Sequence, residues 1–234
     1  MTTTPKVTLV TCKALPNLFP GEEGLLDELA SRGCDPQIKV WNDPDVDWAD
    51  AGMVVVRSVS DYASDRPAFL EWTKQLRRVQ NSADVLNWNT DKHYLKELAA
   101  LGMPTIPTNW LEPEQNLSKH QIHTRFPAFG EFVVKPAVSS GVRDIGRYTT
   151  VDTRQRQAAM RQVQGLLGDG RSVMIQRYVE EIDLHGEISL VFFNGLVSHA
   201  VEKRSALHPA SVSDPAVHEA VVTAEAADSV AWKW

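Results

Sequence analysis

Cysteine is nearly absent from this chain: Cys12 and Cys34 are the only two among 234 residues. They form no CxxC pair, which excludes a disulfide framework and is typical of a reducing compartment. Long apolar runs are also missing, since the longest, at residues 188–193, is far too short to cross a bilayer. The first residues, MTTTPKVTLVTC, lack the charged and apolar regions of a signal peptide. We therefore expect a cytoplasmic protein with no membrane partner.

Two further absences narrow the function. Basic residues are not in excess, because 24 Lys and Arg stand against 30 Asp and Glu, and a net charge of −6 argues against nucleic acid as a partner. No GxGxxG follows the first expected strand, so a dinucleotide-binding Rossmann site has no support. What is present is an apolar fraction of 43%. A chain of this length can bury about 70–75% of its unfolded surface, so a substantial core is expected.

Strands alternate with helices in the first part of the chain. The expected strands are 6–12, 37–41 and 53–57, and the expected helices are 22–32 and 66–79. Residues 53–57 are almost entirely apolar, as in the centre of a parallel sheet. Gly33 is the expected stop of the first helix. The pattern predicts an α/β fold class, with an N-terminal parallel α/β domain over residues 1–88.

The second part of the chain has a different pattern. The expected helices are 91–101 and 152–167, and the expected strands are 132–135, 172–178, 187–193 and 196–203. Thr90 is positioned to cap the helix that begins at Asp91. Residues 109–130 are polar and favour a loop or a short helix. We therefore expect an α+β body after the N-terminal domain.

The last two expected strands form a hairpin. Asn194-Gly195 between them is the strongest short hairpin signal. A regular two-residue turn pairs Phe193 with Leu196 and places Glu187 opposite Glu202. Like charges in that position destabilise a sheet, so we expect an arginine, a lysine or a metal ion nearby.

Segment 132–148 carries the clearest chemical signal. An apolar strand ends in Lys135, and a loop that contains Ser139, Ser140, Gly141 and two arginines follows it. Backbone N–H groups, hydroxyls and cations of this kind suit a polyphosphate. Taken alone, Lys135 could instead be an edge lysine that reaches solvent, and the loop could be a flexible turn.

Several motifs occur in an order that resembles one known family. They are Asn89-Thr90-Asp91-Lys92, Gly102-x-Pro104-x-x-Pro107-Thr108, Val133-Val134-Lys135-Pro136, Gln176-Arg177-Tyr178-Val179-Glu180-Glu181 and Gly186-Glu187-x-Ser189 with Lys203 after it. Together they resemble the ATP-grasp superfamily on its glutathione-synthetase-like side. The nearest resemblance is to the ligases that include the cyclo-ligase forming D-cycloserine from O-ureidoserine. It implies an ATP-grasp domain over residues 89–204, with a lid subdomain at about 110–180.

The resemblance also implies roles for individual residues. The implied nucleotide-binding residues are Lys92, Lys135, Ser139, Ser140, Gly141, Gln176, Tyr178, Val179, Glu180, Asp183 and Glu187. Within this set Lys92 and Lys135 contact phosphates, residues 176–179 form the adenine hinge, and Glu180 or Asp183 holds the ribose. The implied catalytic contacts come from Arg143 on the lid and from Lys203 or Arg204. Lys92 could also be an ordinary solvent-facing helix residue.

The reaction implied by the resemblance joins or cyclises a small amino-acid-like carboxylate by means of ATP and Mg²⁺. Arg57 follows the central strand and is the candidate substrate anchor, although it could equally be a strand-end cation. Ser60 stands where relatives often have Trp, which puts an identical substrate in doubt. The expected partner is a small-molecule substrate, and the sequence does not decide whether the chain forms a homo-oligomer.

The end of the chain departs from the family pattern. Acidic and Asn magnesium ligands are expected late in an ATP-grasp body, and no such motif occurs before Trp234. After Arg204 we expect a connector and an amphipathic helix that begins at Asp214, together filling 205–234. The sequence therefore predicts an incomplete ATP-grasp domain, cut inside an element, with its metal ligands beyond Trp234. The alternative is a nucleotide-binding remnant without activity.

Overall fold

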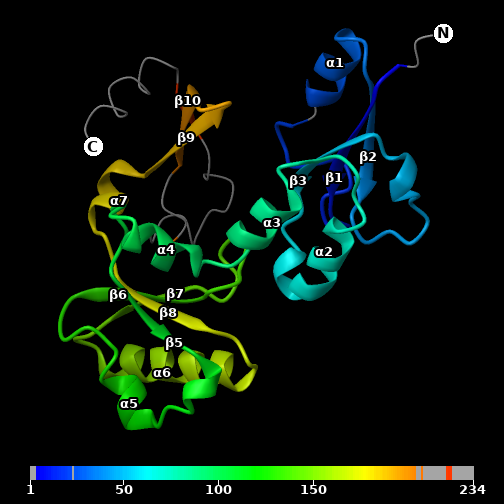
Figure 1. Cartoon of the computed structure of the whole chain (residues 1–234). Coiled ribbons are helices and arrows are strands. Elements are labelled where there is room, and N and C mark those ends of the chain that lie inside the picture. The colour runs from blue at the N-terminus through cyan, green and yellow to red at the C-terminus, as the bar shows by residue number, and fades with distance from the viewer. Residues whose placement is uncertain (1–3, 23, 204–206, 208–219, 223–234) are drawn as a thin grey trace. The chain divides into compact units, whose positions relative to one another are not determined.

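The computed structural model describes residues 4–22, 24–203, 207 and 220–222 (Figure 1). The described residues form two compact units, one within 1–105 and 136–143 and the other within 106–135 and 144–222. The first unit holds a parallel sheet and the second holds antiparallel strand pairs, so the predicted α/β class is confirmed. The boundary at 88/89 and the lid subdomain at 110–180 concern family domains and stay predictions.

The first unit is built on a four-stranded parallel sheet with the order β2-β1-β3-β4. Its strands are β1 (Lys6–Thr11), β2 (Asp35–Val40), β3 (Met53–Ser58) and β4 (Val79–Gln80). Its helices are α1 (Gly24–Ser31), α2 (Arg66–Thr73), α3 (Ala83–Asn89) and α4 (Tyr94–Ala100), with short 3-10 turns η1 (Trp48–Asp50) and η2 (Tyr62–Ser64).

Alternation along β1 explains how this sheet is covered on both faces. Val7 and Leu9 pack with leucines of α1, while Val10, on the opposite face, packs with Phe69 and Trp72 of α2. Successive side chains of a strand point to opposite faces, so the side chains of this one apolar strand pack into two separate cores. This is the buried parallel arrangement that the apolar run of β3 predicted.

Two helix predictions in this unit are wrong in detail. The helix expected at 66–79 ends at Thr73, and Val79–Gln80 forms β4 beside β3. Thr90 is not an N-cap: Ser82 caps the unpredicted helix α3, and Thr90 ends it by donating its hydroxyl to the Leu86 carbonyl at 2.7 Å. The cap at Ser82 starts the helix earlier, and α4 begins only at Tyr94.

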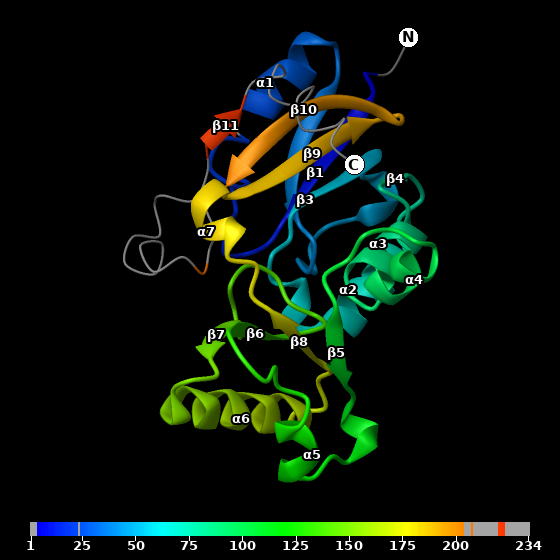
Figure 2. The same cartoon turned by 90° about the vertical axis from the view of Figure 1, so that its left-hand side faces the viewer.

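The second unit contains a four-stranded sheet with the order β5-β8-β6-β7. Its strands are β5 (Thr108–Leu111), β6 (Glu131–Pro136), β7 (Gly146–Thr149) and β8 (Val173–Arg177). Helices α5 (Lys119–His123) and α6 (Thr153–Gly168) lie along one face, as Figures 1 and 2 show, and η3 (Pro113–Gln115) precedes α5. The core on that face includes Phe132 and Val134 of β6 and Val173 and Ile175 of β8. Strand β5 lies where the sequence favoured a loop.

The second unit also contains the predicted hairpin, formed by β9 (Glu187–Phe193) and β10 (Leu196–Lys203) after helix α7 (Glu181–His185). The expected register fails because the pairing shifts by one residue between Val197 and His199. Beyond that bulge Glu187 pairs with Lys203 and not with Glu202. The β-bulge thus removes the like-charge pair that a regular hairpin would impose.

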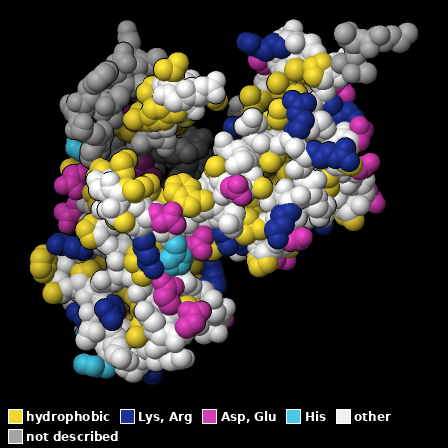
Figure 3. Space-filling model, viewed as in Figure 1, with side chains coloured by type: hydrophobic (Ala, Val, Ile, Leu, Met, Phe, Trp, Pro, Cys, Tyr) yellow, Lys and Arg dark blue, Asp and Glu magenta, His cyan; other side chains and the backbone are white. Residues whose placement is uncertain are grey.

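The predicted C-terminal helix is wrong where the structure describes it. Ala220–Val222 form β11, which pairs antiparallel with β10. The predicted start of that helix at Asp214 lies outside the described residues. In the described part of the chain no helix is long and apolar enough to cross a membrane. On the face seen in Figure 3, basic and acidic side chains are interspersed, which agrees with the balanced composition.

Candidate functional site

Lys135 is a half-buried cation on the sheet of the second unit. Phe132 and Val134 point into the core beneath the helices, so Lys135 faces the other side of the sheet. Its ammonium has no hydrogen bond or salt bridge to any described residue, and its main electrostatic neighbour is Glu187. Burial lowers the pKa of Lys135, and Glu187 offsets part of that shift. A desolvated cation of this kind favours an anionic ligand.

The predicted hinge, residues 176–179, begins at the end of β8, which is the neighbour of the Lys135 strand β6 in the sheet. The Gln176 side chain is buried and donates from Nε2 to the Thr108 hydroxyl at 2.7 Å. The Tyr178 backbone N–H donates to the Glu131 carbonyl at 2.9 Å. These bonds fix the start of the segment, and Val179 and Glu180 follow as the chain enters α7.

Arg147 holds the hinge through contacts that sequence analysis missed. Its guanidinium pairs with Glu131 on β6 and, at 2.8 Å, with Asp183 on α7, and it lies 3.7 Å from the centre of the Tyr178 ring. Burial opposes its charge, but the hydrogen bonds to Glu131 and Asp183 outweigh that and raise the pKa of Arg147. The sequence signal was the second arginine of the loop, to which no role was given.

Asp183 was a predicted ribose ligand, and the structure engages both of its oxygens within the protein. Oδ1 accepts from the Tyr178 hydroxyl at 2.5 Å, and Oδ2 meets Arg147. Glu180, the alternative ribose ligand, is exposed and precedes α7. Of the two, Glu180 is the carboxylate with more room for a ligand.

In the first unit, Lys92 lies beside the loop that follows β6. Its ammonium donates to the Ser139 hydroxyl at 2.8 Å and to the carbonyls of Ser139 and Ala137 at 3.0 and 3.3 Å. The Tyr62 hydroxyl donates to the same Ser139 carbonyl at 3.0 Å, and Arg143 donates to the Ser64 hydroxyl at 3.0 Å. Lys92 is therefore not a simple solvent-facing residue.

The loop itself is clasped by these contacts. Gly141 takes a positive φ of 62°, which glycine adopts without strain, and Ser140 is half-exposed next to it. The predicted phosphate loop, which includes Arg143, is thus brought together with Lys92 in one unit. Sequence analysis missed Tyr62 and Ser64, because their contacts join residues more than seventy positions apart.

The candidate substrate residue Arg57 is paired within the protein. Its guanidinium contacts the Glu22 carboxylate, which also accepts from the Ser58 hydroxyl at 2.6 Å. The Ser58 hydroxyl in turn accepts from the Phe19 backbone N–H at 2.9 Å. Arg57 therefore connects the end of β3 to the loop that follows β1.

The remaining predicted residues lie on the hairpin or after it. Glu187 is exposed at the start of β9, and its backbone partner is Lys203 at the end of β10. Arg204 lies outside the described residues. Among the residues that the structure describes, no three His, Cys, Asp or Glu side chains gather to hold a metal ion.

Comparisons with known proteins place this geometry in a family. The family model for the N-terminal domain of the D-cycloserine synthetase DcsG matches residues 7–87. The cycloserine biosynthesis protein DcsG of Streptomyces lavendulae is 35% identical over 190 residues, which are 79% of this chain. The chain spans 62% of the length of that relative.

Solved structures that resemble this chain point to the same family. The crystal structure of D-cycloserine synthetase DcsG matches with a TM-score of 0.76 and 31% identity over 93% of this chain and 71% of that chain. A RimK domain ATP-grasp protein of Sphaerobacter thermophilus matches with a TM-score of 0.62 and 18% identity over 90% of this chain and 77% of its own. D-alanyl-alanine synthetase A of Vibrio cholerae matches with a TM-score of 0.61 and 14% identity over 98% of this chain and 80% of that chain. The last two show the fold alone, and the resemblance read from the sequence is confirmed. The chain belongs to the ATP-grasp superfamily and, within it, to the DcsG-like proteins.

Proposed function

We propose that this chain binds ATP and carries the nucleotide site of an ATP-dependent ligase. The observation that supports this most directly is Lys135. It is half-buried, its pKa is lowered by burial, and its ammonium has no hydrogen-bond partner among the described residues. An unpaired buried cation costs stability, so its presence favours a role in binding an anion. Family membership makes ATP the proposed anion.

The proposed reaction joins a carboxylate to an amine or closes a ring within one substrate. A substrate carboxylate oxygen attacks the γ-phosphorus of ATP, the bond to ADP breaks, and an acyl phosphate forms. A nucleophilic nitrogen then attacks the acyl carbon, loses its proton and displaces phosphate. The protein contributes positioning and neutralisation of charge. We assign phosphate neutralisation to Lys92 and Lys135, with Arg143, Lys203 and Arg204 as the further cations.

Magnesium is part of this proposal but not of its steps. Mg²⁺ bound to ATP would neutralise phosphate charge and orient the leaving group. The described residues offer Glu180 and Glu187 as exposed carboxylates but no cluster of three ligands. No step is therefore assigned to a metal held by this part of the chain.

The proposed substrate is a small amino-acid-like carboxylate. Arg57 is the proposed anchor, and it lies 43% exposed beside Glu22. A guanidinium that is already oriented by a carboxylate can receive a second carboxylate on its free N–H groups with little further ordering. The name of DcsG, a D-cycloserine synthetase, agrees with a substrate of this class.

Calorimetry tests the nucleotide site. MgATP is titrated into the chain, into Lys135→Ala and into Lys119→Ala, in which an exposed lysine on α5 loses the same charge. We expect Lys119→Ala to match the parent chain and Lys135→Ala to bind about tenfold more weakly, as for a lost charge-assisted hydrogen bond. Equal affinity of Lys135→Ala and Lys119→Ala would refute the assignment.

Phosphate release separates a ligase from a nucleotide-binding protein without activity. The chain is incubated with MgATP and a panel of small amino acids, and inorganic phosphate is measured. We expect release that depends on the amino acid. Binding without any such release would favour the inactive alternative.

A further inference from the structure

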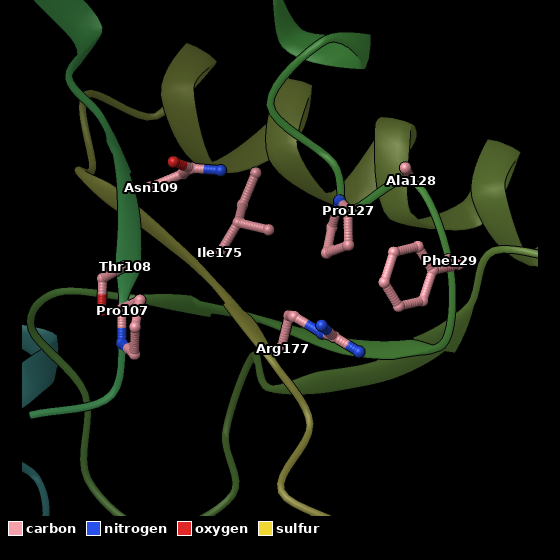
Figure 4. Close-up of a pocket in the computed structure, with 8 residues that line it drawn as sticks. All are labelled: Pro107, Thr108, Asn109, Pro127, Ala128, Phe129, Ile175 and Arg177. Atoms are coloured by element: carbon pink, nitrogen blue, oxygen red, sulfur yellow. The ribbon is translucent and has the colours of Figure 1, made fainter.

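A pocket in the second unit lies on the helix-covered side of its sheet. Its volume is about 330 Å³, and it is lined by Pro107, Thr108, Asn109, Pro127, Ala128, Phe129, Ile175 and Arg177 (Figure 4). We call it the Arg177 pocket. Ile175 belongs to the core beneath the helices, so Arg177, two residues on along β8, points to the same side. Lys135 faces the opposite side, which makes this pocket distinct from the proposed nucleotide site.

Arg177 is the charged group of this pocket. Its guanidinium carbon lies 4.5 Å from the centre of the Phe129 ring, and Figure 4 shows its end directed toward that ring. Its N–H groups make no hydrogen bond or ion pair with any described residue. Stacking on an aromatic face orients the guanidinium plane and leaves its donor edges free for a ligand.

The other walls supply shape and apolar surface. Phe129 is 65% exposed, so much of its ring surface is available for contact with a ligand. Pro107 and Pro127 are conformationally restricted. The two polar lining residues are already hydrogen-bonded within the protein. The Thr108 hydroxyl accepts from Gln176 Nε2 and donates to the Ile106 carbonyl. The Asn109 amide donates to the Arg125 carbonyl at 2.7 Å.

Charge and size together define the ligand class. The lining residues include no Asp or Glu, so the pocket is positive. A volume of about 330 Å³ falls at the small end of sites that hold metabolites. A fork of N–H donors matches a carboxylate, and an exposed ring beside it matches a planar apolar body.

We propose that the Arg177 pocket is a second small-molecule site, which takes a planar apolar molecule with one carboxylate. Arg177 binds the carboxylate, and Phe129 with the two prolines contacts the apolar body. This proposal goes beyond the ligase function and does not depend on it, because the two sites lie on opposite sides of the sheet. A positive result at one site therefore leaves the other to be decided separately.

The probe is sodium benzoate, titrated into the ¹⁵N-labelled chain while amide chemical shifts are followed. Benzamide keeps the ring without the charge, and acetate keeps the charge without the ring. We expect saturable benzoate shifts at residues 107–109, 127–130 and 175–177, with benzamide and acetate each at least about fivefold weaker, as for one lost interaction of ordinary strength. The same shifts should persist in Lys135→Ala.

Variants test the two recognition groups. We expect Arg177→Gln to bind benzoate about tenfold more weakly and Phe129→Leu several-fold more weakly. Arg32→Gln, which removes an exposed arginine directly after helix α1, should not change binding. If Arg177→Gln loses its dispersed spectrum, Arg177→Lys takes its place. Lysine keeps the charge without the planar fork, so weaker binding is again expected.

Three results would overturn the proposal. The first is equal affinity for benzoate and benzamide, which would show that the charge is not recognised. The second is unchanged binding in Arg177→Gln or, where that variant does not fold, in Arg177→Lys. The third is loss of the benzoate shifts in Lys135→Ala, which would place the anion at the proposed nucleotide site.

Discussion

At the scale of single residues, Lys135 is maintained at the expense of folding stability. Burial disfavours its charged form and lowers its pKa, and Glu187 restores only part of the loss. The unfolded chain solvates the same ammonium fully, at an ordinary pKa of 10.5. Between the lowered pKa and 10.5 the unfolded state binds more protons, so the free energy of unfolding rises with pH in that window.

We therefore predict that Lys135→Met is more stable than the parent chain at pH 7, by about 1 kcal/mol, although it loses nucleotide affinity. The gain should shrink as pH rises through the lowered pKa of Lys135 toward 10.5, because the parent lysine then becomes neutral in the folded state. Urea unfolding at several pH values measures both effects. A variant less stable than the parent at pH 7 would contradict the desolvation argument.

Only some of the candidate site residues could be predicted from the sequence. Lys135, Lys92 and the Ser/Gly loop could be singled out because each is unusual beside its neighbours in the chain. Their partners could not, because Tyr62 and Ser64 meet the loop only after folding. The Arg57–Glu22 pair was missed for the same reason. Pairing in space has no local signature in one sequence.

At the scale of elements, Arg147 connects its own strand, β7, with β6, α7 and the end of β8. It lies on β7, pairs with Glu131 on β6 and Asp183 on α7, and covers the ring of Tyr178 just beyond β8. Tyr178 in turn bonds to the Glu131 carbonyl. The hinge is thus held in one conformation before any ligand arrives.

We predict that Arg147→Ala lowers the free energy of unfolding by about 2 kcal/mol, because two carboxylates lose their shared cation. Arg154→Ala, at the solvent-facing start of α6, removes the same charge and should change stability by less than about 0.5 kcal/mol. Urea denaturation of both variants measures the difference. Equal losses would show that the Arg147 contacts contribute nothing beyond a surface charge.

The loop that follows β6 supports a second prediction at this scale. Tyr62 donates to the Ser139 carbonyl, and burial raises the pKa of its phenol, so it stays a donor. Tyr62→Phe removes this bond and should speed tryptic cleavage after the exposed Arg143 by about fivefold, as for one hydrogen bond of ordinary strength. Tyr94→Phe is the matched control. Mass spectrometry times the cleavage, and identical rates for the two variants would contradict the role of Tyr62.

Elements were predicted well where apolar periodicity was long and poorly where an end was decided by a cap or a bulge. The strands β1, β3, β6 and β8 and helix α6 lie within a residue or two of their predicted ranges. Helix α2 ended early because Val79 and Gln80 gained strand partners. The hairpin register failed because one extra residue in β10 moved Lys203 opposite Glu187.

At the scale of the whole molecule, nucleotide binding should appear as added stability. A ligand that binds only the folded state stabilises it by about 2.7 kcal/mol when present at a hundred times its dissociation constant. For a chain of this size each kcal/mol raises the melting temperature by about 2–4 °C. We therefore predict that MgATP at that concentration raises the melting temperature of the parent chain by about 5–10 °C.

The size of this shift separates Lys135 from general charge effects. If Lys135→Ala binds tenfold more weakly, the same MgATP concentration is only ten times its dissociation constant, and the stabilisation falls to about 1.4 kcal/mol. The shift should then be about half that of the parent, while Lys119→Ala keeps the full value. Differential scanning fluorimetry measures all three. A parent chain that MgATP does not stabilise would refute nucleotide binding, and equal shifts in both lysine variants would move the phosphate contact away from Lys135.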